Sequence, residues 1–177
     1  MIGSKKKKIG IFGGSFDPPH QGHLKISKIA IDKLSLDELY WCVTKKNPFK
    51  NKTFFSLSIR IKKSKLLTNK VKKIKVKYFE DEVKSTNSID LIKYLKKKNE
   101  KYQFFLIIGS DNLIKFHKWK KWKQLTNLLE IVVFSRKDYD VRSRKSAIIK
   151  KVKKIIYIKN KPINISSTQI RAKLNYI

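Results

Sequence analysis

The sequence predicts an α/β domain in which a doubly wound parallel sheet carries helices on both faces. Short apolar segments alternate with longer segments of helical periodicity along the whole chain. No linker, internal repeat or Pro/Gly/Ser-rich boundary divides the 177 residues, and a chain of this length suits one domain that buries roughly 70% of its unfolded surface. We therefore expect a single domain over residues 1–177.

The apolar segments predict strands that pair in parallel, because a helix-like segment separates each from the next. The expected strands are Lys8–Gly13, Glu38–Val43, Lys73–Phe79, Phe104–Gly109, Glu130–Phe134 and Ile155–Ile158. The expected helices are Gly22–Leu34, Ser56–Leu67, Ser88–Lys98, Leu113–Leu129 and Ser143–Lys154, and a short last helix follows Ser167. In such sheets ligands bind beyond the carboxyl ends of the strands, where the winding reverses direction. If the strands ending at Gly13 and Gly109 are neighbours there, the two Gly-bearing turns face one cleft.

The net charge has three competing explanations. The chain carries 44 Lys and Arg against 13 Asp and Glu, a formal charge of +31. We favour a general compositional bias, then attraction of small anions, and last a nucleic-acid partner, because the lysines are not gathered into one footprint. The stretch FHKWKKWKQL interleaves aromatic residues with lysines, but Phe116, Trp119 and Trp122 fall on one helical face. We interpret that face as part of the core.

The cellular setting is constrained by the apolar runs and by the cysteine content. No apolar run reaches the eighteen or so residues of a membrane span, and the basic start is not followed by the apolar region of a signal peptide. Cys42 is the only cysteine, which excludes a disulfide framework and indicates a reducing compartment. We expect a cytoplasmic protein with Cys42 as a buried, unreactive thiol.

Residues 9–24, IGIFGGSFDPPHQGHL, contain the strongest chemical signal. Gly13 and Gly14 end a strand where backbone N–H groups can approach a ligand, and His20 and His23 lie one turn apart at a helix start. A helix start favours phosphate, and imidazole N–H groups add directional donors. Metal ligation would need a third ligand, and His117 lies far along the chain, so we expect no metal held by the protein. Neither G-x-G-x-x-G nor a Walker loop occurs.

Three motifs together resemble one enzyme superfamily. GGSFDPPHQGHL resembles the G-x-F-D-P-x-H-x-G-H signature of the nucleotidyltransferases, and ISSTQIR, at Ile165–Arg171, resembles their second signature. FFLIIGSDNLIKFHKW, at Phe104–Trp119, resembles the nicotinate-nucleotide adenylyltransferases. The similarity covers nearly the whole chain in order, and it implies a Rossmann-like fold.

The resemblance implies that the enzyme joins ATP and nicotinate mononucleotide into nicotinate adenine dinucleotide, releasing pyrophosphate, in NAD biosynthesis. It implies that Mg²⁺ is bound with ATP and pyrophosphate. His20, His23 and Arg171 would be catalytic, as donors to phosphate rather than as a general base. The implied ATP contacts are Gly13, Gly14, Ser15, Phe16, His20, Gly22, His23, Gly109, Asp111, Ser166, Ser167, Thr168 and Arg171. The implied contacts to nicotinate mononucleotide are Ser15, Phe16, Lys46, Asn87, Ser88, Trp119 and Arg136.

The acceptor region departs from the family pattern. Family members commonly carry P-S-Y-T before the helix that begins at Ser88, whereas this chain reads KSTNSID, with Asn87 and Ser88 in the places of Tyr and Thr. Nicotinamide mononucleotide as acceptor is a close alternative. A phosphopantetheine adenylyltransferase is another, although that family usually has Thr in place of His20. A basic nucleic-acid-binding module is the alternative from a different class, and a homo-oligomer is left open.

Overall fold

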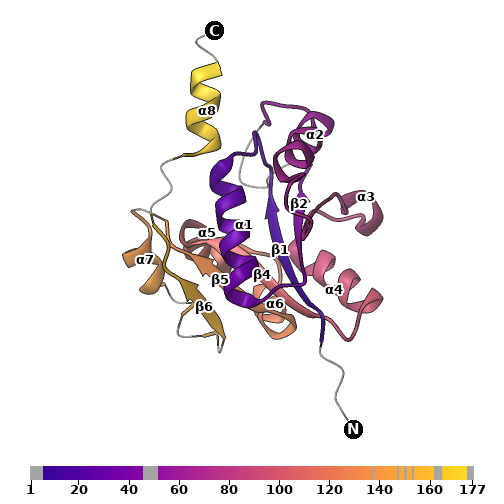
Figure 1. The fold of residues 1–177 in the computed structure, drawn as a ribbon. Helices are drawn as coiled ribbons and strands as arrows, with labels where there is room; N and C mark the ends of the chain where they lie inside the picture. Colours follow the sequence, from indigo (N-terminus) through magenta and orange to yellow (C-terminus); the bar gives the residue numbers. More distant parts are fainter. Residues whose placement is uncertain are drawn as a thin grey trace.

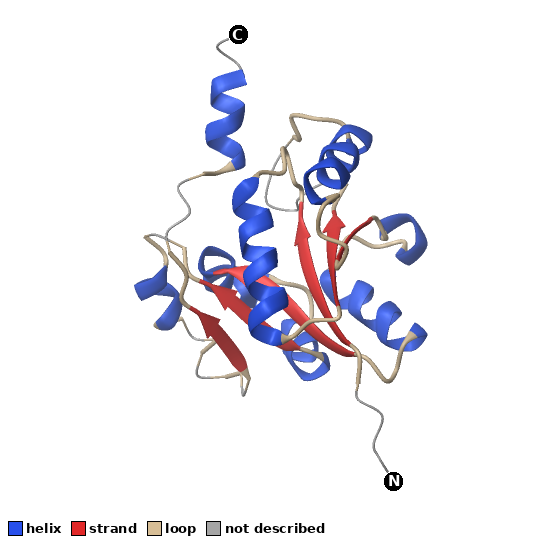
Figure 2. Ribbon diagram, in the orientation of Figure 1, coloured by secondary structure: helices blue, strands red, loops and turns tan. Residues whose placement is uncertain are grey.

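The fold is an open parallel sheet between two layers of helices (Figures 1 and 2). The structure is a computed structural model that describes residues 6–45, 52–136, 138–146, 148–149, 151–152, 154–161 and 165–174. Its strands are β1 (Lys8–Gly14), β2 (Glu38–Val43), β3 (Ile74–Lys77), β4 (Gln103–Gly109), β5 (Glu130–Phe134) and β6 (Ile155–Ile158). Its helices are α1 (Gln21–Leu34), α2 (Leu57–Thr68), α3 (Glu80–Val83), α4 (Ser88–Lys98), α5 (Ser110–Lys115), the 3-10 turn η1 (Phe116–Lys118), α6 (Trp122–Leu128), α7 (Asp140–Arg144) and α8 (Ser167–Leu174).

The strand order confirms the predicted doubly wound topology. Within the described residues the strands form one sheet in the order β3-β2-β1-β4-β5-β6, and every pair in it is parallel. β1 lies between β2 and β4, with Ile9 opposite Glu38 on one side and Phe104 on the other. The winding therefore reverses at the carboxyl ends of β1 and β4, where ligands of such sheets bind.

The core consists of two apolar layers, one on each face of the sheet. Ile9 and Ile11 of β1 belong to the cluster that α4, α5, η1 and α6 cover. On β4, Phe105 and Ile107 belong to the opposite cluster, which contains Leu24 and other residues of α1. Because successive strand residues point to opposite faces, each central strand contributes to both layers and reads as a continuous apolar run.

The helix predicted over Leu113–Leu129 is wrong. The structure divides this segment into α5, η1 and α6, with Trp119 in an extended conformation and Lys121 at φ 50°. The apolar spacing survives the break, because Phe116, Leu125 and Leu129 are all buried in one cluster and Trp119 packs against it. The stripe is therefore part of the core, as predicted, but it is carried by three short elements.

The region after β5 also differs from the prediction. The helix expected at Ser143–Lys154 is instead α7, at Asp140–Arg144, and the described residues beyond it are turns and irregular segments before β6. Arg136 and Asp140 explain the earlier start, since the Arg136 N–H donates to the Asp140 carboxylate at 3.0 Å and ties the helix to the end of β5. β3 is shorter than the predicted Lys73–Phe79, and α3 was not predicted.

Two further features bear on the expectations about membrane spans and about Cys42. None of the helices in the described ranges has the length and apolarity needed to cross a bilayer. Cys42 is buried between its strand neighbours, as expected, and burial raises the pKa of its thiol to about 12, which favours the protonated form.

Candidate active site

The first signature forms the loop from β1 into α1. His20 is the N-cap of α1, with extended backbone angles, and the two histidine side chains complete a reciprocal capping box. The Gly22 N–H donates to Nδ1 of His20 at 3.1 Å, and the His20 N–H donates to Nδ1 of His23 at 3.2 Å. A capping box usually consists of Ser or Thr at the N-cap and Glu or Gln three residues later. Here two histidine side chains accept from the same backbone N–H groups instead.

The capping box fixes which ring nitrogen of each histidine carries the proton. A neutral imidazole has one donor and one acceptor nitrogen, and Nδ1 of both His20 and His23 is the acceptor. The proton is therefore on Nε2, and no partner for either Nε2 occurs in the part of the chain that the structure describes. The two rings lie 3.8 Å apart between centroids, so the site presents a pair of adjacent N–H donors.

The surroundings keep both imidazoles neutral. Burial, with a further contribution from the positive charge of Arg136, lowers the pKa of His20 to about 4. Burial, then His20, then Arg136 lower the pKa of His23 to about 3. At neutral pH both rings are thus hydrogen-bond donors without a charge, which suits the binding of phosphate oxygens and excludes a protonated general acid in the free protein.

An aromatic stack beneath the loop holds His23 in place. Phe16, at φ 46°, stacks on Trp41 of β2 with centroids 4.6 Å apart and planes inclined by 8°. The ring of His23 lies 5.1 Å from that of Phe16. Ser27 links the same elements, because it accepts from Nε1 of Trp41 at 2.7 Å and donates to the His23 carbonyl at 2.8 Å. The donors therefore rest on the core of the domain.

The second signature meets the first one across more than 140 residues of sequence. The Ser167 hydroxyl donates to the Pro18 carbonyl at 2.9 Å, and Nη1 of Arg171 donates to the Asp17 carbonyl at 2.6 Å. Nη2 of Arg171 donates to the Thr168 hydroxyl at 3.2 Å. Figure 1 shows α8 projecting beyond the end at which α1 begins, so these bonds attach its first turns to the loop that carries the histidines.

The start of α8 is closed by its own cap. The Ser166 hydroxyl accepts from the Gln169 N–H at 3.2 Å, which satisfies one of the free N–H groups at the helix start.

The ends of β4 and β5 supply an ion pair beside the histidines. Nη1 of Arg136 lies 2.8 Å from Oδ2 of Asp111, and Oδ1 of Asp111 is buried without a partner in the described chain. A Cβ on Gly109 would lie 2.4 Å from Oδ1 of Asp111, so a larger residue there would displace this carboxylate from its position. A buried, unpaired acceptor next to a strand end suits a hydroxyl donor from a ligand.

Gly13 and Gly14 differ in their surroundings. A Cβ on Gly13 would meet nothing within 4 Å, whereas one on Gly14 would meet Phe16 at 3.4 Å. Gly13 is exposed and its backbone is open to approach at the strand end.

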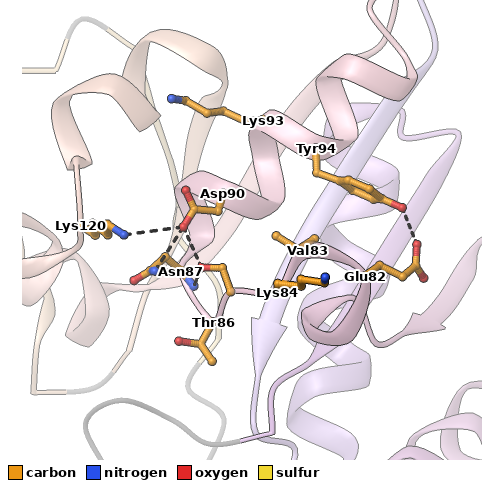
Figure 3. A pocket seen from close by; sticks show the side chains of 10 residues that line it. Glu82, Val83, Lys84, Thr86, Asn87, Asp90, Lys93, Tyr94 and Lys120 are labelled. Carbon is orange, nitrogen blue, oxygen red and sulfur yellow. Dashed lines mark hydrogen bonds and ion pairs between the residues drawn. The ribbon is translucent and has the colours of Figure 1, made fainter.

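The residues expected to bind the acceptor come from several segments of the chain. Asn87 lies on a groove of about 730 Å³ beside α4 (Figure 3). There Asp90 accepts from Ser85 at 2.7 Å and from Nδ2 of Asn87 at 3.2 Å, and Lys120 approaches it at 3.9 Å. In the segment replacing P-S-Y-T, the side chains of Ser85 and Asn87 are therefore bonded to each other and to Asp90.

Three further residues were predicted to bind nicotinate mononucleotide, namely Ser88, Trp119 and Lys46. Ser88 begins α4, and Trp119 packs on Phe116 with its Nε1 buried and unpartnered among the described residues. Lys46 lies outside the described residues. The roles predicted for the individual site residues stay predictions. In the described ranges no group of three or more His, Cys, Asp and Glu side chains could hold a metal ion.

Sequence reasoning missed Arg60, whose guanidinium is buried at the same edge of the sheet. The side chain is 1% exposed, and burial lowers its pKa. The pattern of α2 contained a signal, since its buried positions Arg60, Ser64 and Thr68 are all polar and spaced by four residues. A charged residue in such a buried row needs hydrogen-bond partners there, and Arg60 has them.

Comparison with known proteins agrees with this geometry. The family model described as cytidylyltransferase-like matches residues 11–173. A probable nicotinate-nucleotide adenylyltransferase of Pelagibacter ubique is 46% identical over 172 residues, covering 96% of this chain and 95% of the relative. One from Rhizobium leguminosarum bv. trifolii is 38% identical over 129 residues, or 72% of this chain and 67% of the relative.

A solved structure supports the same assignment. The Plasmodium falciparum nicotinic acid mononucleotide adenylyltransferase, complexed with NaAD, superposes with a TM-score of 0.75 at 25% identity, covering 94% of this chain and 83% of that one. The fold, both signatures and these relatives agree: the chain belongs to the cytidylyltransferase-like family and, within it, to the nicotinate-nucleotide adenylyltransferases.

Proposed function

We propose that the protein transfers the adenylyl group of ATP to nicotinate mononucleotide, forming nicotinate adenine dinucleotide and pyrophosphate in NAD biosynthesis. One observation carries the assignment of the catalytic groups. Ser167 and Arg171 bond to the main chain at Pro18 and Asp17, two and three residues before His20. The phosphate-binding residues implied by both signatures thus converge on one turn at the carboxyl edge of the sheet.

The reaction requires positioning more than proton transfer. A phosphate oxygen of nicotinate mononucleotide attacks the α-phosphorus of ATP, the new P–O bond forms, and the bond between the α-phosphorus and the bridging oxygen breaks to release pyrophosphate. The attacking phosphate is largely deprotonated at neutral pH, so no general base is needed. The Nε2–H groups of His20 and His23 are fixed by their caps and remain neutral, and they donate to the oxygens on which charge accumulates.

Arg171 and the β4 end complete the ATP site. The Arg171 guanidinium has donors left beyond those used on Asp17 and Thr168, and it binds the β- and γ-phosphates. The free Oδ1 of Asp111 accepts from a ribose hydroxyl. Arg136 then binds the acceptor phosphate, because it lies close enough to the histidines to influence their pKa values.

Mg²⁺ enters this proposal as a component of the nucleotide substrate. The groups gathered at the turn are N–H, hydroxyl and guanidinium donors, which fit phosphate oxygens, and the nearby carboxylate of Asp111 is paired with Arg136. We infer that the ion is held by ATP and leaves with pyrophosphate.

The decisive experiment measures pyrophosphate release by the purified protein with Mg²⁺ and ATP. Nicotinate mononucleotide, nicotinamide mononucleotide and phosphopantetheine are offered separately as acceptors. Release chiefly with the first is expected, and a preference for either of the others would correct the acceptor. Folded protein that releases none with all three would overturn the proposal, and tight, salt-sensitive binding of nucleic acid without turnover would favour the alternative class. A cytoplasmic location and a homo-oligomer stay predictions.

A further inference from the structure

Arg60 is a buried cation whose bonds go to main-chain carbonyls. Its Nη1 donates to Ser15 at 2.6 Å and to Thr44 at 2.7 Å, its Nη2 donates to Lys45 at 2.9 Å, and its Nε donates to Phe55 at 3.1 Å. No salt bridge to it occurs in the described part of the chain. Four acceptors from three segments therefore surround one guanidinium.

The three segments all lie at the carboxyl edge of the sheet. Ser15 follows β1 and precedes the histidine turn, Thr44 and Lys45 follow β2, and Phe55 precedes α2. Among the described residues of these segments, the main-chain bond between them runs from the Thr44 N–H to the Gly14 carbonyl at 3.0 Å. The side chain of Arg60 adds a bond to each of the three segments and so ties them to one another.

Asp17 also connects the loop after β1 to the segment before α2, but as an acceptor rather than as a donor. Its carboxylate is buried and accepts from the N–H groups of Phe54 and Phe55 at 2.7 and 2.9 Å. The Phe55 residue is thus held by its carbonyl through Arg60 and by its N–H through Asp17. The main-chain carbonyl of Asp17 is also the acceptor of Arg171, so the same turn carries the attachment of α8.

We propose that Arg60 is a positioning residue for adenylyl transfer, which fixes the loop after β1 against the loop after β2 so that both substrates meet in reacting geometry. The inference rests on the proposed function for its catalytic part. Arg60 does not touch the reacting atoms. It acts through Ser15 and through the turn that ends in His20, because a loop displaced by even one ångström loses much of the advantage of orientation.

The fork of the guanidinium is what this role requires. A lysine places three donors on one nitrogen and lacks the separate Nε, Nη1 and Nη2 donors that Arg60 spreads around one plane, while a methionine of similar length has no donor. Arg60→Met therefore removes all four bonds, and Arg60→Lys retains the charge and part of the bonding. Thr68→Val is the matched control, since Thr68 lies two turns further along α2, is buried, and bonds only to carbonyls of its own helix.

The test compares kcat, KM and loop protection in these variants. We expect Arg60→Met to lower kcat about 100-fold and Arg60→Lys about tenfold, with each KM changed less than about threefold, because orientation is lost while the substrate contacts remain. Thr68→Val keeps kcat within about twofold of the unmodified protein. Independently of turnover, exchange of the Phe54 and Phe55 amide hydrogens should accelerate about tenfold in Arg60→Met and stay unchanged in Thr68→Val.

The outcomes separate this inference from the proposed function. An active unmodified protein combined with a folded Arg60→Met or Arg60→Lys that retains kcat would overturn the positioning role and leave the proposed function intact. Loss of kcat that merely follows the loss of thermal stability, equally in Thr68→Val, would overturn it as well. If the unmodified protein is inactive, the proposed function fails, and unchanged amide exchange in Arg60→Met would still refute the loop attachment.

Discussion

The two signatures are held by the fold in opposite ways. The first one, from Gly13 to His23, rests on the core, since Phe16 is 2% exposed, Trp41 beneath it is fully buried, and His23 packs against both. The second one lies on α8, which has no buried residue and reaches the domain through Ser167 and Arg171. One half of the site is built into the sheet, and the other half is attached to it by side chains.

This difference has a consequence for how the site is assembled. The acceptors of Ser167 and Arg171 are the main-chain carbonyls of Pro18 and Asp17, so α8 has a defined position only if the first turn is already formed. The first turn has further support besides α8, because its caps and the stack of Phe16 on Trp41 are made without that helix. Damage to the first signature should therefore affect both halves, and damage to the second only one.

The largest effect is expected at His20. His20→Ala removes the Nε2 donor and the N-cap, whereas His20→Asn removes the donor and retains a good cap. Both should lower kcat about 1,000-fold, and only His20→Ala should lower the free energy of unfolding, by about 1 kcal/mol. Turnover assays together with urea unfolding check this. Equal nucleotide transfer by His20→Asn and the unmodified protein would remove the catalytic role of that ring.

A smaller and purely functional effect is expected on α8. Arg171→Ala should lower kcat about 100-fold, since one charge-assisted donor to phosphate is lost. The free energy of unfolding should change by less than about 0.5 kcal/mol, because α8 buries no residue. Lys173→Ala on the same helix is the control and should leave both quantities unchanged. A large loss of stability in Arg171→Ala would mean that α8 supports the fold and that the contrast between the signatures does not hold.

Much of the fold could be predicted because it depends on local patterns. The strands at Glu38–Val43, Glu130–Phe134 and Ile155–Ile158 and the helix at Ser88–Lys98 begin and end where predicted. Each is a short apolar run or an amphipathic repeat bounded by polar residues. The prediction for Leu113–Leu129 was wrong because it also relied on a local pattern. The i, i+3 spacing of its apolar residues is compatible with three short elements as well as with one helix. A spacing pattern does not report the turn at Lys121 that separates them.

The site could be predicted only where its chemistry is contiguous in the sequence. His20 and His23 are three residues apart, and their positions at a helix start follow from the Gly and Pro residues before them. Arg60 could not be recognised in the same way, because the four carbonyls it bonds to come from three separate segments. Every residue has a main-chain carbonyl, so the sequence does not indicate which ones serve as acceptors. Only the tertiary structure brings them together.

The support beneath the first signature can be tested without touching the donors. Ser27→Ala removes the hydroxyl that joins Trp41 to the His23 carbonyl and leaves Nε1 of Trp41 buried without a partner. We expect the free energy of unfolding to fall by about 1–3 kcal/mol, with a smaller effect on kcat than in His20→Asn. A double-mutant cycle with Trp41→Phe measures the coupling, and additive effects would show that the hydroxyl does not join the two elements.

A pH dependence of stability is expected from the two histidines of the first signature. The pKa values of His20 and His23 are about 4 and about 3 in the folded protein, below the ordinary value of 6.5. As the pH falls through 6.5, the unfolded chain therefore takes up protons that the folded protein does not, so the free energy of unfolding decreases from there toward pH 3. Between pH 7.5 and 5, above the range of most carboxylates, His20→Asn should show about half the decrease of the unmodified protein, while Arg171→Ala should show all of it. Urea unfolding at these two pH values checks the difference, and equal decreases in the unmodified protein and His20→Asn would mean that the first imidazole is charged in the folded state.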